Sequence, residues 1–395
     1  MWKFGTWNVF KHKYNYWLLI IKEKRKRMSN RPHILILAGQ TGGGHISLAE
    51  ALRDQLELDY AITILNLLPN LFGYSYRFAG QHALWLYSMA FHLSDRPGQA
   101  RSSQRLFVPL IESRLKRALD LIQPSLVITT HSLISHAAKL VLEKYSPDIP
   151  FVMLFSDPYS IHSSWFSELD AEATFAPTRE SRALALANGF DPGRLHLVGW
   201  PVRSQFYRTG ELSRAETLTR LKLDPDRFTI FLQGGGDGAA NFWRSTEHLL
   251  AAHEGVQVIL ATGTNHALLR RFKGTKNLYV LPLTREIAPY MAAADIVMGK
   301  AGPNVLFEAG VLGKPFIATT YIPGQEKGNL EFIERHGLGW VALKMEQQRE
   351  LVRRLATDDT LANGVLVKVD EYRRWNSDAN ASILPIIRSL VPEKR

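Results

Sequence analysis

The chain has 395 residues, more than a single hydrophobic core usually serves, so two domains are expected. Hydrophobic residues make up 46% of it, enough for large cores, and the net charge of +11 favours anionic partners. Because cysteine is absent, disulfides, thiolate metal sites and thiol nucleophiles are excluded.

Residues 1–30 form a basic, aromatic extension. Residues 1–31 contain nine Lys or Arg against the single Glu23, interleaved with Trp, Tyr and Phe. No apolar run here is long enough to span a bilayer, and no small-residue cleavage site follows. Two interpretations stay open: a segment that binds anionic lipid, or a solvated leader upstream of a start at Met28. Nucleic acid is not an expected partner, because no nucleic-acid-binding motif appears.

From Pro32 onward, apolar runs of strand length alternate with segments of helical period. The expected strands are 33–38, 61–65, 126–130, 151–155 and 195–198, then 228–232, 256–261, 278–283, 295–298 and 315–319. Their nearly continuous Val, Ile, Leu and Phe are typical of strands buried on both faces. The pattern predicts an α/β fold of two Rossmann-like, doubly wound domains that face each other across a cleft.

Breaks in this alternation give the expected domain boundaries. A first domain covers 31–205 and a second covers 206–375, with a linker around 201–213. Residues 376–395 are expected to form a C-terminal helix that packs back on the first domain. Residues 71–122 lack a strand pattern and are expected to be a helical insertion, rich in cations and in aromatic side chains such as Trp85 and Tyr87. The insertion is either ordinary core packing or a platform that meets lipid.

The strand at 33–38 runs into a glycine-rich turn that ends at His45. The turn contains Thr41, Gly42, Gly43 and Gly44, and a helix follows. Successive glycines let a ligand approach the backbone closely, and a helix N-terminus favours an anion. An imidazole at a helix start is disfavoured as a cation, so His45 can serve as a general base. Alone the turn is a weak signal, because it also suits a tight turn without a ligand.

Four expected strands of the second domain end in similar glycine-rich, polar turns. Parallel strands bring their carboxyl ends to one edge of a sheet, so these turns converge on what looks like a nucleotide site. The candidate donor-binding residues in them are Gly234, Gly235, Gly236, Thr262, Gly263, Asn265, Ala301, Gly302, Pro303, Asn304, Gln325, Glu326 and Asn329.

Two charged residues complete the candidate site. Arg203 offers a fork of donors to a diphosphate, and Glu308 offers a carboxylate to a ribose diol. The alternatives are an Arg203 that only pairs with a neighbouring acid, and a Glu308 that lies on a helix surface. Asp157 is a lone carboxylate, so no acidic metal cluster is expected.

At this point the sequence resembles a known family. The stretches 41–45, 199–203, 234–238, 300–303 and 322–329 are similar to motifs of the monogalactosyldiacylglycerol synthases and of the processive diacylglycerol glucosyltransferases, which are family 28-type enzymes. The segment from His162 to Phe166 is similar to the His-x-x-Trp-Phe segment of that family.

The sequence also departs from this family at three positions. Gln40 stands where an Asp is usual, and Asn304 stands at a small, glycine-type position. Phe307 precedes Glu308 where the family often has Ala. These positions bear on acceptor orientation and sugar choice more than on nucleotide binding.

The resemblance implies the GT-B fold and an inverting transfer of galactose or glucose from UDP-galactose or UDP-glucose to diacylglycerol. It implies no metal and no other cofactor. By the matching motifs, His45 is the base or an acceptor-site residue, with Gly43 and Gly44 beside it in the donor site. Arg203 would hold the diphosphate, Glu308 the ribose, and Gln325 with Glu326 the sugar.

The resemblance further implies an acceptor and membrane side in the first domain. Its candidate residues are His162, Trp165, Trp85 and Tyr87. The enzyme would be cytoplasmic and attached peripherally to the anionic inner face of the cell membrane. Three alternatives stay open: an N-acetylglucosaminyltransferase of the lipid II type, a UDP-N-acetylglucosamine 2-epimerase, and an inactive sugar-nucleotide-binding protein.

Overall fold

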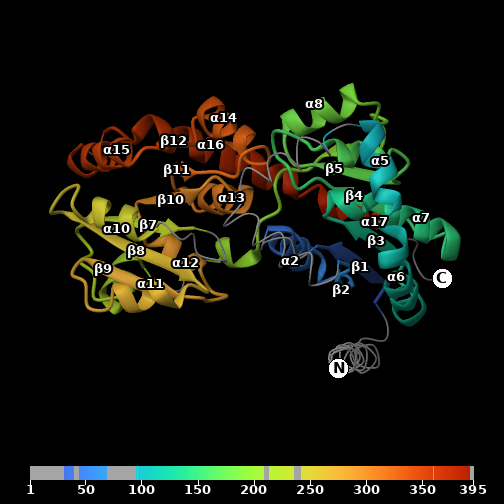
Figure 1. Cartoon of the computed structure of the whole chain (residues 1–395), viewed down its shortest axis with the longest axis horizontal. Coiled ribbons are helices and arrows are strands. Elements are labelled where there is room, and N and C mark those ends of the chain that lie inside the picture. The colour runs from blue at the N-terminus through green and yellow to red at the C-terminus, as the bar shows by residue number, and fades with distance from the viewer. Residues whose placement is uncertain are drawn as a thin grey trace, which may run out of the picture.

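The fold contains two parallel sheets of six strands, each flanked by helices (Figure 1). The computed structural model describes residues 31–39, 44–68, 95, 97–208, 213–234, 242–358 and 360–391. The central strands are buried along most of their length and are rich in Val, Ile, Leu and Phe, because helices cover both faces of each sheet. The α/β, two-domain prediction is therefore confirmed.

The first sheet has the strand order β2-β1-β3-β4-β5-β6. Its strands are β1 (His33–Ala38), β2 (Ala61–Asn66), β3 (Leu126–Thr129), β4 (Phe151–Leu154), β5 (Ala173–Ala176) and β6 (Leu195–Leu197). The helices around it are α2 (Gly44–Leu56), α5 (Pro97–Arg105), α6 (Val108–Ile122), η1 (Ser132–Ile134), α7 (Ser135–Tyr145), η2 (Ser163–Ser167) and α8 (Arg179–Ala187). Helices α5 and α6 lie within the predicted helical insertion.

The second sheet has the strand order β12-β11-β10-β7-β8-β9. Its strands are β7 (Phe228–Gln233), β8 (Val256–Gly263), β9 (Leu278–Pro282), β10 (Ile296–Lys300), β11 (Phe316–Thr320) and β12 (Gly339–Val341). The helices around it are η3 (Ser204–Phe206), α9 (Arg214–Arg220), α10 (Phe242–Leu250), α11 (His266–Arg271), α12 (Ala288–Ala292), α13 (Pro303–Val311), α14 (Lys327–His336) and α15 (Met345–Thr357).

Each sheet has one place where the chain reverses its direction of winding. In the first sheet this switch point lies between β1 and β3, and in the second it lies between β7 and β10. Loops that leave neighbouring strands there run to opposite faces, which opens a crevice at the carboxyl ends. Helix α2 is the next described element after β1, and Gly234 and Gly302 follow β7 and β10, the strands at these two places.

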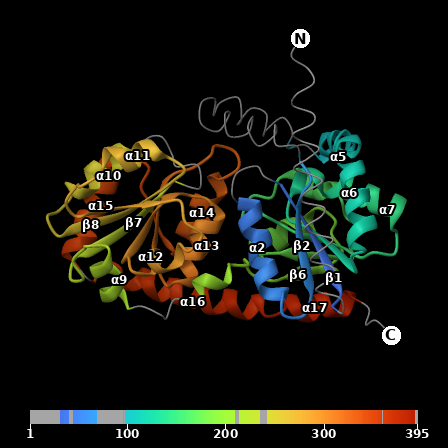
Figure 2. The same ribbon diagram turned by 90° about the horizontal axis from the view of Figure 1, so that it is seen from below.

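The last two helices join the domains from below. Helix α16 (Asn363–Asn380) lies under the second domain, and α17 (Ile383–Leu390) continues under the first, as Figure 2 shows. Ile383 and Ile387 are fully buried in the core that contains β1. Asn380 accepts a hydrogen bond from Gln55 at 2.8 Å, and Arg388 pairs with Asp59 at 2.7 Å. The C-terminal segment thus rests on α2 and on the loop after it.

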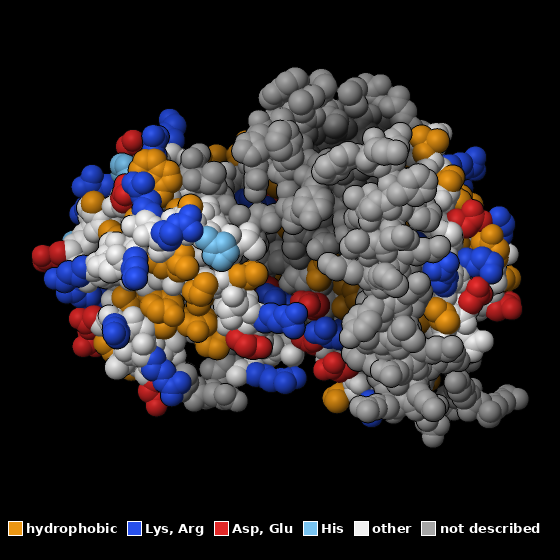
Figure 3. Space-filling view, turned by 60° about the horizontal axis from the view of Figure 1, so that its bottom comes forward, with side chains coloured by type: hydrophobic (Ala, Val, Ile, Leu, Met, Phe, Trp, Pro, Cys, Tyr) orange, Lys and Arg blue, Asp and Glu red, His pale blue; other side chains and the backbone are white. Residues whose placement is uncertain are grey.

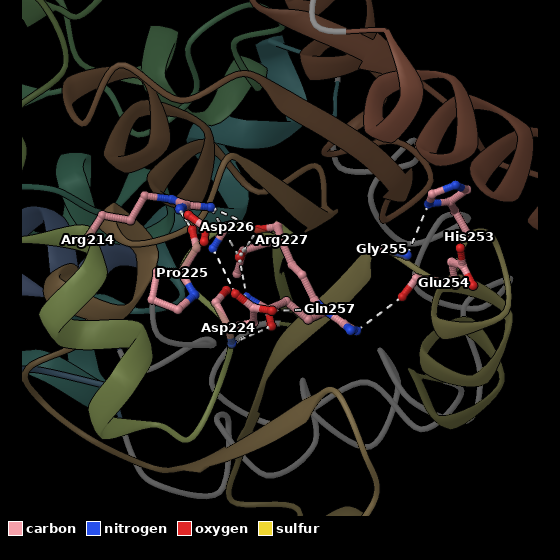
Figure 4. A network of polar contacts seen from close by, with 10 residues as sticks. Arg214, Asp224, Pro225, Asp226, Arg227, His253, Glu254, Gly255 and Gln257 are labelled. Atoms are coloured by element: carbon pink, nitrogen blue, oxygen red, sulfur yellow. Dashed lines mark hydrogen bonds and ion pairs between the residues drawn. The ribbon is translucent and has the colours of Figure 1, made fainter.

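A polar network fixes the opposite end of the second sheet (Figure 4). Arg214, in the first turn of α9, donates to the carbonyl oxygens of Pro225 and Arg227. The side chain of Gln257 accepts from the backbone N–H of Asp224 at 3.0 Å and donates to its carbonyl oxygen at 2.7 Å. These residues precede β7 or begin β8, so the network lies at the amino ends of the strands and away from the glycine-rich turns.

Candidate active site

His45 is the second residue of α2, the helix that follows the first switch point, and its ring has a fixed orientation. Its Nδ1 lies 2.8 Å from the carbonyl oxygen of Thr130, which follows β3. A carbonyl oxygen only accepts, so Nδ1 carries the proton and Nε2 keeps its lone pair. Burial lowers the pKa of His45 below its ordinary value, which outweighs the opposite effect of the Thr130 carbonyl. His45 is therefore neutral near pH 7, as a general base must be.

A second imidazole supports the ring of His45. His131 is 2% exposed and stacks on His45 with ring centroids 4.2 Å apart and an angle of 28°. The ring fills the space beside Gly39, where an added Cβ would come within 1.9 Å of His131 Cδ2. Glycine at position 39 is thus required by the close approach of a buried ring. No sequence motif indicated His131, since the contact is made between β1 and β3.

Arg203 and Glu308, predicted at the diphosphate and the ribose, contact each other. Arg203 Nη2 lies 2.8 Å from Glu308 Oε1, and Nε lies 3.3 Å from the same oxygen. Ser47 of α2 donates to that oxygen at 3.5 Å. Burial raises the pKa of Glu308, while Arg203 acts in the opposite direction. The pair joins the linker to α13, and α2 lies against both.

The turns after β10 and before α14 are tied together by predicted site residues. Glu326 is 4% exposed, and its carboxylate contacts Lys300 and accepts from the backbone N–H of Ile322 at 2.8 Å. Asn329 is 3% exposed and donates to the carbonyl oxygen of Ala301 at 2.8 Å. Gln325 lies next to Glu326, half-buried. The sugar contacts proposed for these residues stay predictions.

Three further candidates lie at the end of β8 and have local roles. The Thr262 hydroxyl donates to the carbonyl oxygen of Leu281 at 3.2 Å. Gly263 has a φ of 54°, a left-handed conformation that favours glycine. Asn265 caps α11 by accepting from the backbone N–H groups of residues 267 and 268 at 3.2 Å.

Two known protein families match the chain. Residues 45–202 match the monogalactosyldiacylglycerol (MGDG) synthase family, and residues 229–362 match the glycosyltransferase family 28 C-terminal domain. The first part of the chain thus matches the monogalactosyldiacylglycerol synthase family, and the second part matches glycosyltransferase family 28. The two matches together cover β2 to β6, nearly all of the second sheet, His45 and α13. Strand β1 precedes the first match, and Arg203 lies one residue beyond its end. The chain is therefore a glycosyltransferase.

Plant relatives of this family align with most of the chain. The probable monogalactosyldiacylglycerol synthase 2 of Oryza sativa subsp. japonica is 27% identical over 370 residues, which cover 88% of this chain and 76% of that protein. Monogalactosyldiacylglycerol synthase 3 of Arabidopsis thaliana is 29% identical over 329 residues, which cover 78% and 70%. Both names carry the word chloroplastic.

Solved structures agree on the fold alone. TcCGT1 in complex with UDP has a TM-score of 0.62 at 14% identity, covering 91% of this chain and 99% of that one. The MurG protein of Acinetobacter baumannii has a TM-score of 0.56 at 14% identity, covering 91% and 99%. These glycosyltransferase neighbours confirm the predicted GT-B arrangement.

Several predicted site residues lie outside the described part of the chain. They are Gly43, Gly235 and Gly236 of the donor turns, and Trp85 and Tyr87 of the insertion. The basic extension and Gln40 lie outside it as well. Among the residues that are described, no group of three or more His, Asp or Glu side chains could hold a metal ion.

Trp165 has a different role from the predicted one. Its side chain is 0% exposed and packs edge-on against Phe155 at a centroid distance of 5.2 Å. A ring with no exposed surface cannot meet a membrane, so that part of the prediction is wrong. His162, which is 6% exposed, caps η2 by accepting from the backbone N–H of Ser164 at 3.1 Å. Both residues shape the loop that follows β4.

Asp157 is a candidate functional residue that the sequence did not reveal. It lies at the carboxyl end of β4, and its Oδ2 accepts from Trp165 Nε1 at 2.9 Å. Burial raises the pKa of Asp157 to about 6, and the neighbouring Asp95 adds to the rise. The loop continues to Ser160, whose Oγ would lie 2.2 Å from a Cβ on Gly328 of α14. Only the Asp-Pro dipeptide at a strand end could have drawn attention to it.

The raised pKa of Asp157 predicts a pH-dependent stability. The folded state keeps the Asp157 proton until about pH 6, whereas the unfolded chain loses it near 3.8. The free energy of unfolding should therefore fall by about 2 kcal/mol from this group as the pH rises from 4 to 7. Asp157→Asn keeps an acceptor for Trp165 and should remove that fall. Urea unfolding at several pH values tests this, with the exposed Asp148→Asn as control; parallel wild-type and Asp157→Asn profiles would contradict it.

Proposed function

We propose that this glycosyltransferase moves a galactosyl residue from UDP-galactose to the free hydroxyl of diacylglycerol, with inversion at the anomeric carbon. The observation that carries the proposal is the neutral His45, whose Nε2 lone pair is kept available by the Thr130 carbonyl. The names of the plant relatives support galactose as the sugar and diacylglycerol as the acceptor.

In the proposed reaction, His45 Nε2 takes the proton of the acceptor hydroxyl as its oxygen forms a bond to the anomeric carbon. The bond from that carbon to the UDP oxygen breaks, and its electron pair leaves with the diphosphate. The diphosphate would bind Arg203 in place of Glu308, which frees the carboxylate for the ribose diol.

Because Arg203 and the N-terminus of α13 supply positive potential, we propose that no metal is needed. Transfer that persists in excess EDTA is the expected result.

We further propose that the enzyme works at an anionic membrane surface. The turn between α5 and α6 exposes Leu106 by 75%, the first turn of α6 exposes Leu110 by 44%, and Arg101 and Arg105 of the preceding helix are exposed as well. Apolar side chains flanked by arginines suit a headgroup interface. On the face that Figure 3 shows, basic, acidic and apolar side chains all occur among the described residues. Among the described residues, no helix has the length and apolarity to cross a bilayer. Peripheral attachment to the inner face of the cell membrane would fit.

The test is incubation of the full chain with diacylglycerol vesicles and each of three donors. UDP-galactose, UDP-glucose and UDP-N-acetylglucosamine are supplied separately, over vesicles with or without anionic phospholipid. A β-linked galactosyl product, formed faster on anionic vesicles, is expected. A glucosyl product would show that UDP-glucose is the donor and not UDP-galactose. Equal rates on neutral and on anionic vesicles would contradict the proposed role of an anionic surface. Free N-acetylmannosamine formed without any glycolipid would favour the epimerase alternative.

A further inference from the structure

One face of α13 meets the first domain at two successive turns. Asn304, Phe307 and Glu308 occupy positions i, i+3 and i+4 and therefore share that face. Glu308 contacts Ser47, and Asn304 contacts Gly44, the first residue of α2. The two helices thus touch through matched pairs, one at the start of each helix and one a turn later.

Asn304 is held at both ends of its side-chain amide. Its Nδ2 donates to the carbonyl oxygen of Gly44 at 3.0 Å, and its Oδ1 accepts from Trp200 Nε1 at 3.3 Å. Trp200 is 1% exposed and stacks flat on Phe307, with ring centroids 4.8 Å apart and an angle of 8°. A buried, stacked indole has a fixed N–H direction, so it also fixes the orientation of the Asn304 amide.

Trp200 is in turn held in place by two asparagines of α16. Its backbone N–H donates to Asn376 Oδ1 at 2.6 Å, and its carbonyl oxygen accepts from Asn376 and Asn380 at 3.0 Å and 3.1 Å. Gly199 before it has a φ of 71°, and a Cβ there would lie 2.6 Å from Asn380 Nδ2. These hydrogen bonds fix the backbone of Trp200 against α16, and they therefore also fix the position of its indole ring.

We propose that Asn304 and Trp200 are positioning residues that set the distance between the start of α13 and His45. The inference depends on the glycosyl transfer proposed above, in which the donor phosphates lie at the start of α13. Gly44 adjoins His45, and Asn304 adjoins Pro303, the first residue of α13. One amide side chain thus spans the gap between the base and the donor helix. A displacement of about 1 Å between reacting groups lowers a rate by about 100-fold.

The decisive variant is Asn304→Ala. We expect kcat to fall between about tenfold and about 100-fold, because the bridge to Gly44 is lost. The KM for the UDP-sugar and the dissociation constant of UDP should stay within about twofold of the wild type, since the backbone of α13 is unchanged. Asn188→Ala is the matched control, because Asn188 is exposed and its side-chain amide donates to the carbonyl oxygen of Leu184 in the adjoining helix α8.

Trp200→Phe is the second variant, and it keeps an aromatic ring on Phe307 but removes the N–H. We expect a smaller loss of kcat in the same direction, and a double variant no slower than Asn304→Ala alone, because the two residues act as one unit. Wild-type kcat in Asn304→Ala, or a loss confined to KM, would overturn the inference. If Asn304→Ala fails to fold, unchanged kcat in Trp200→Phe would overturn it equally. A wild-type enzyme that transfers no sugar would instead contradict the proposed function.

Discussion

Replacing His45 by alanine is expected to lower glycosyl transfer by at least about 100-fold while UDP still binds. The Nε2 lone pair is the proposed acceptor of the hydroxyl proton, and loss of a general base usually has an effect of this size. The contacts of Arg203 and Glu308 do not include His45, so the nucleotide side should be unaffected. Initial rates with saturating substrates measure the loss of transfer, and calorimetric titration measures the affinity for UDP.

A matched variant separates this effect from a general loss of stability. His248→Ala removes an exposed imidazole of α10 and should leave both the rate and UDP affinity unchanged. His45→Gln retains a hydrogen-bond donor for Thr130 but holds no basic nitrogen, so its rate should stay as low as that of His45→Ala. Turnover near the wild-type value in His45→Ala would contradict the proposed role of His45 as the general base.

Replacing Arg203 by alanine is expected to weaken UDP binding by about 10- to 100-fold. A charge-assisted bond to a phosphate contributes about 1.5–3 kcal/mol, and each 1.4 kcal/mol is a factor of ten. The free protein should also lose about 2 kcal/mol of unfolding free energy, because Glu308, whose side chain is 8% exposed, would lose its cation. Titration calorimetry and urea unfolding measure the two effects independently.

The two measurements also decide between the alternatives for Arg203. If Arg203 only pairs with Glu308, Arg203→Ala will lose stability and keep its affinity for UDP. If Arg203 binds the diphosphate, Arg203→Lys should recover stability largely and UDP affinity only partly, because an ammonium lacks the guanidinium fork. An Arg203→Ala protein with wild-type affinity for UDP would contradict the donor-site role.

The periodicity of the sequence identified ten of the twelve strands near their observed bounds. The two strands it missed are short and weakly apolar: β5 is Ala-Thr-Phe-Ala, and β12 is Gly-Trp-Val. Their pairing depends on neighbours rather than on their own pattern, since β5 lies between β4 and β6 and β12 completes an edge. A Cβ added to Gly339, at the start of β12, would lie 1.8 Å from the backbone oxygen of Phe316, a close approach that no local rule predicts.

The sequence by itself determined the fold class, the glycine-rich strand ends and the residue types at the candidate site, because these follow from local periodicity and from motif chemistry. Only the tertiary structure decided which of these groups meet. Asn304 with Gly44, Arg203 with Glu308, and His45 with His131 are each separated by more than 80 residues along the chain. Such contacts arise when two helices or strands dock, and the free energy of docking depends on the shape of both partners. Burial likewise made Trp165 a core residue and raised the pKa of Asp157, which a lone carboxylate in a sequence does not indicate.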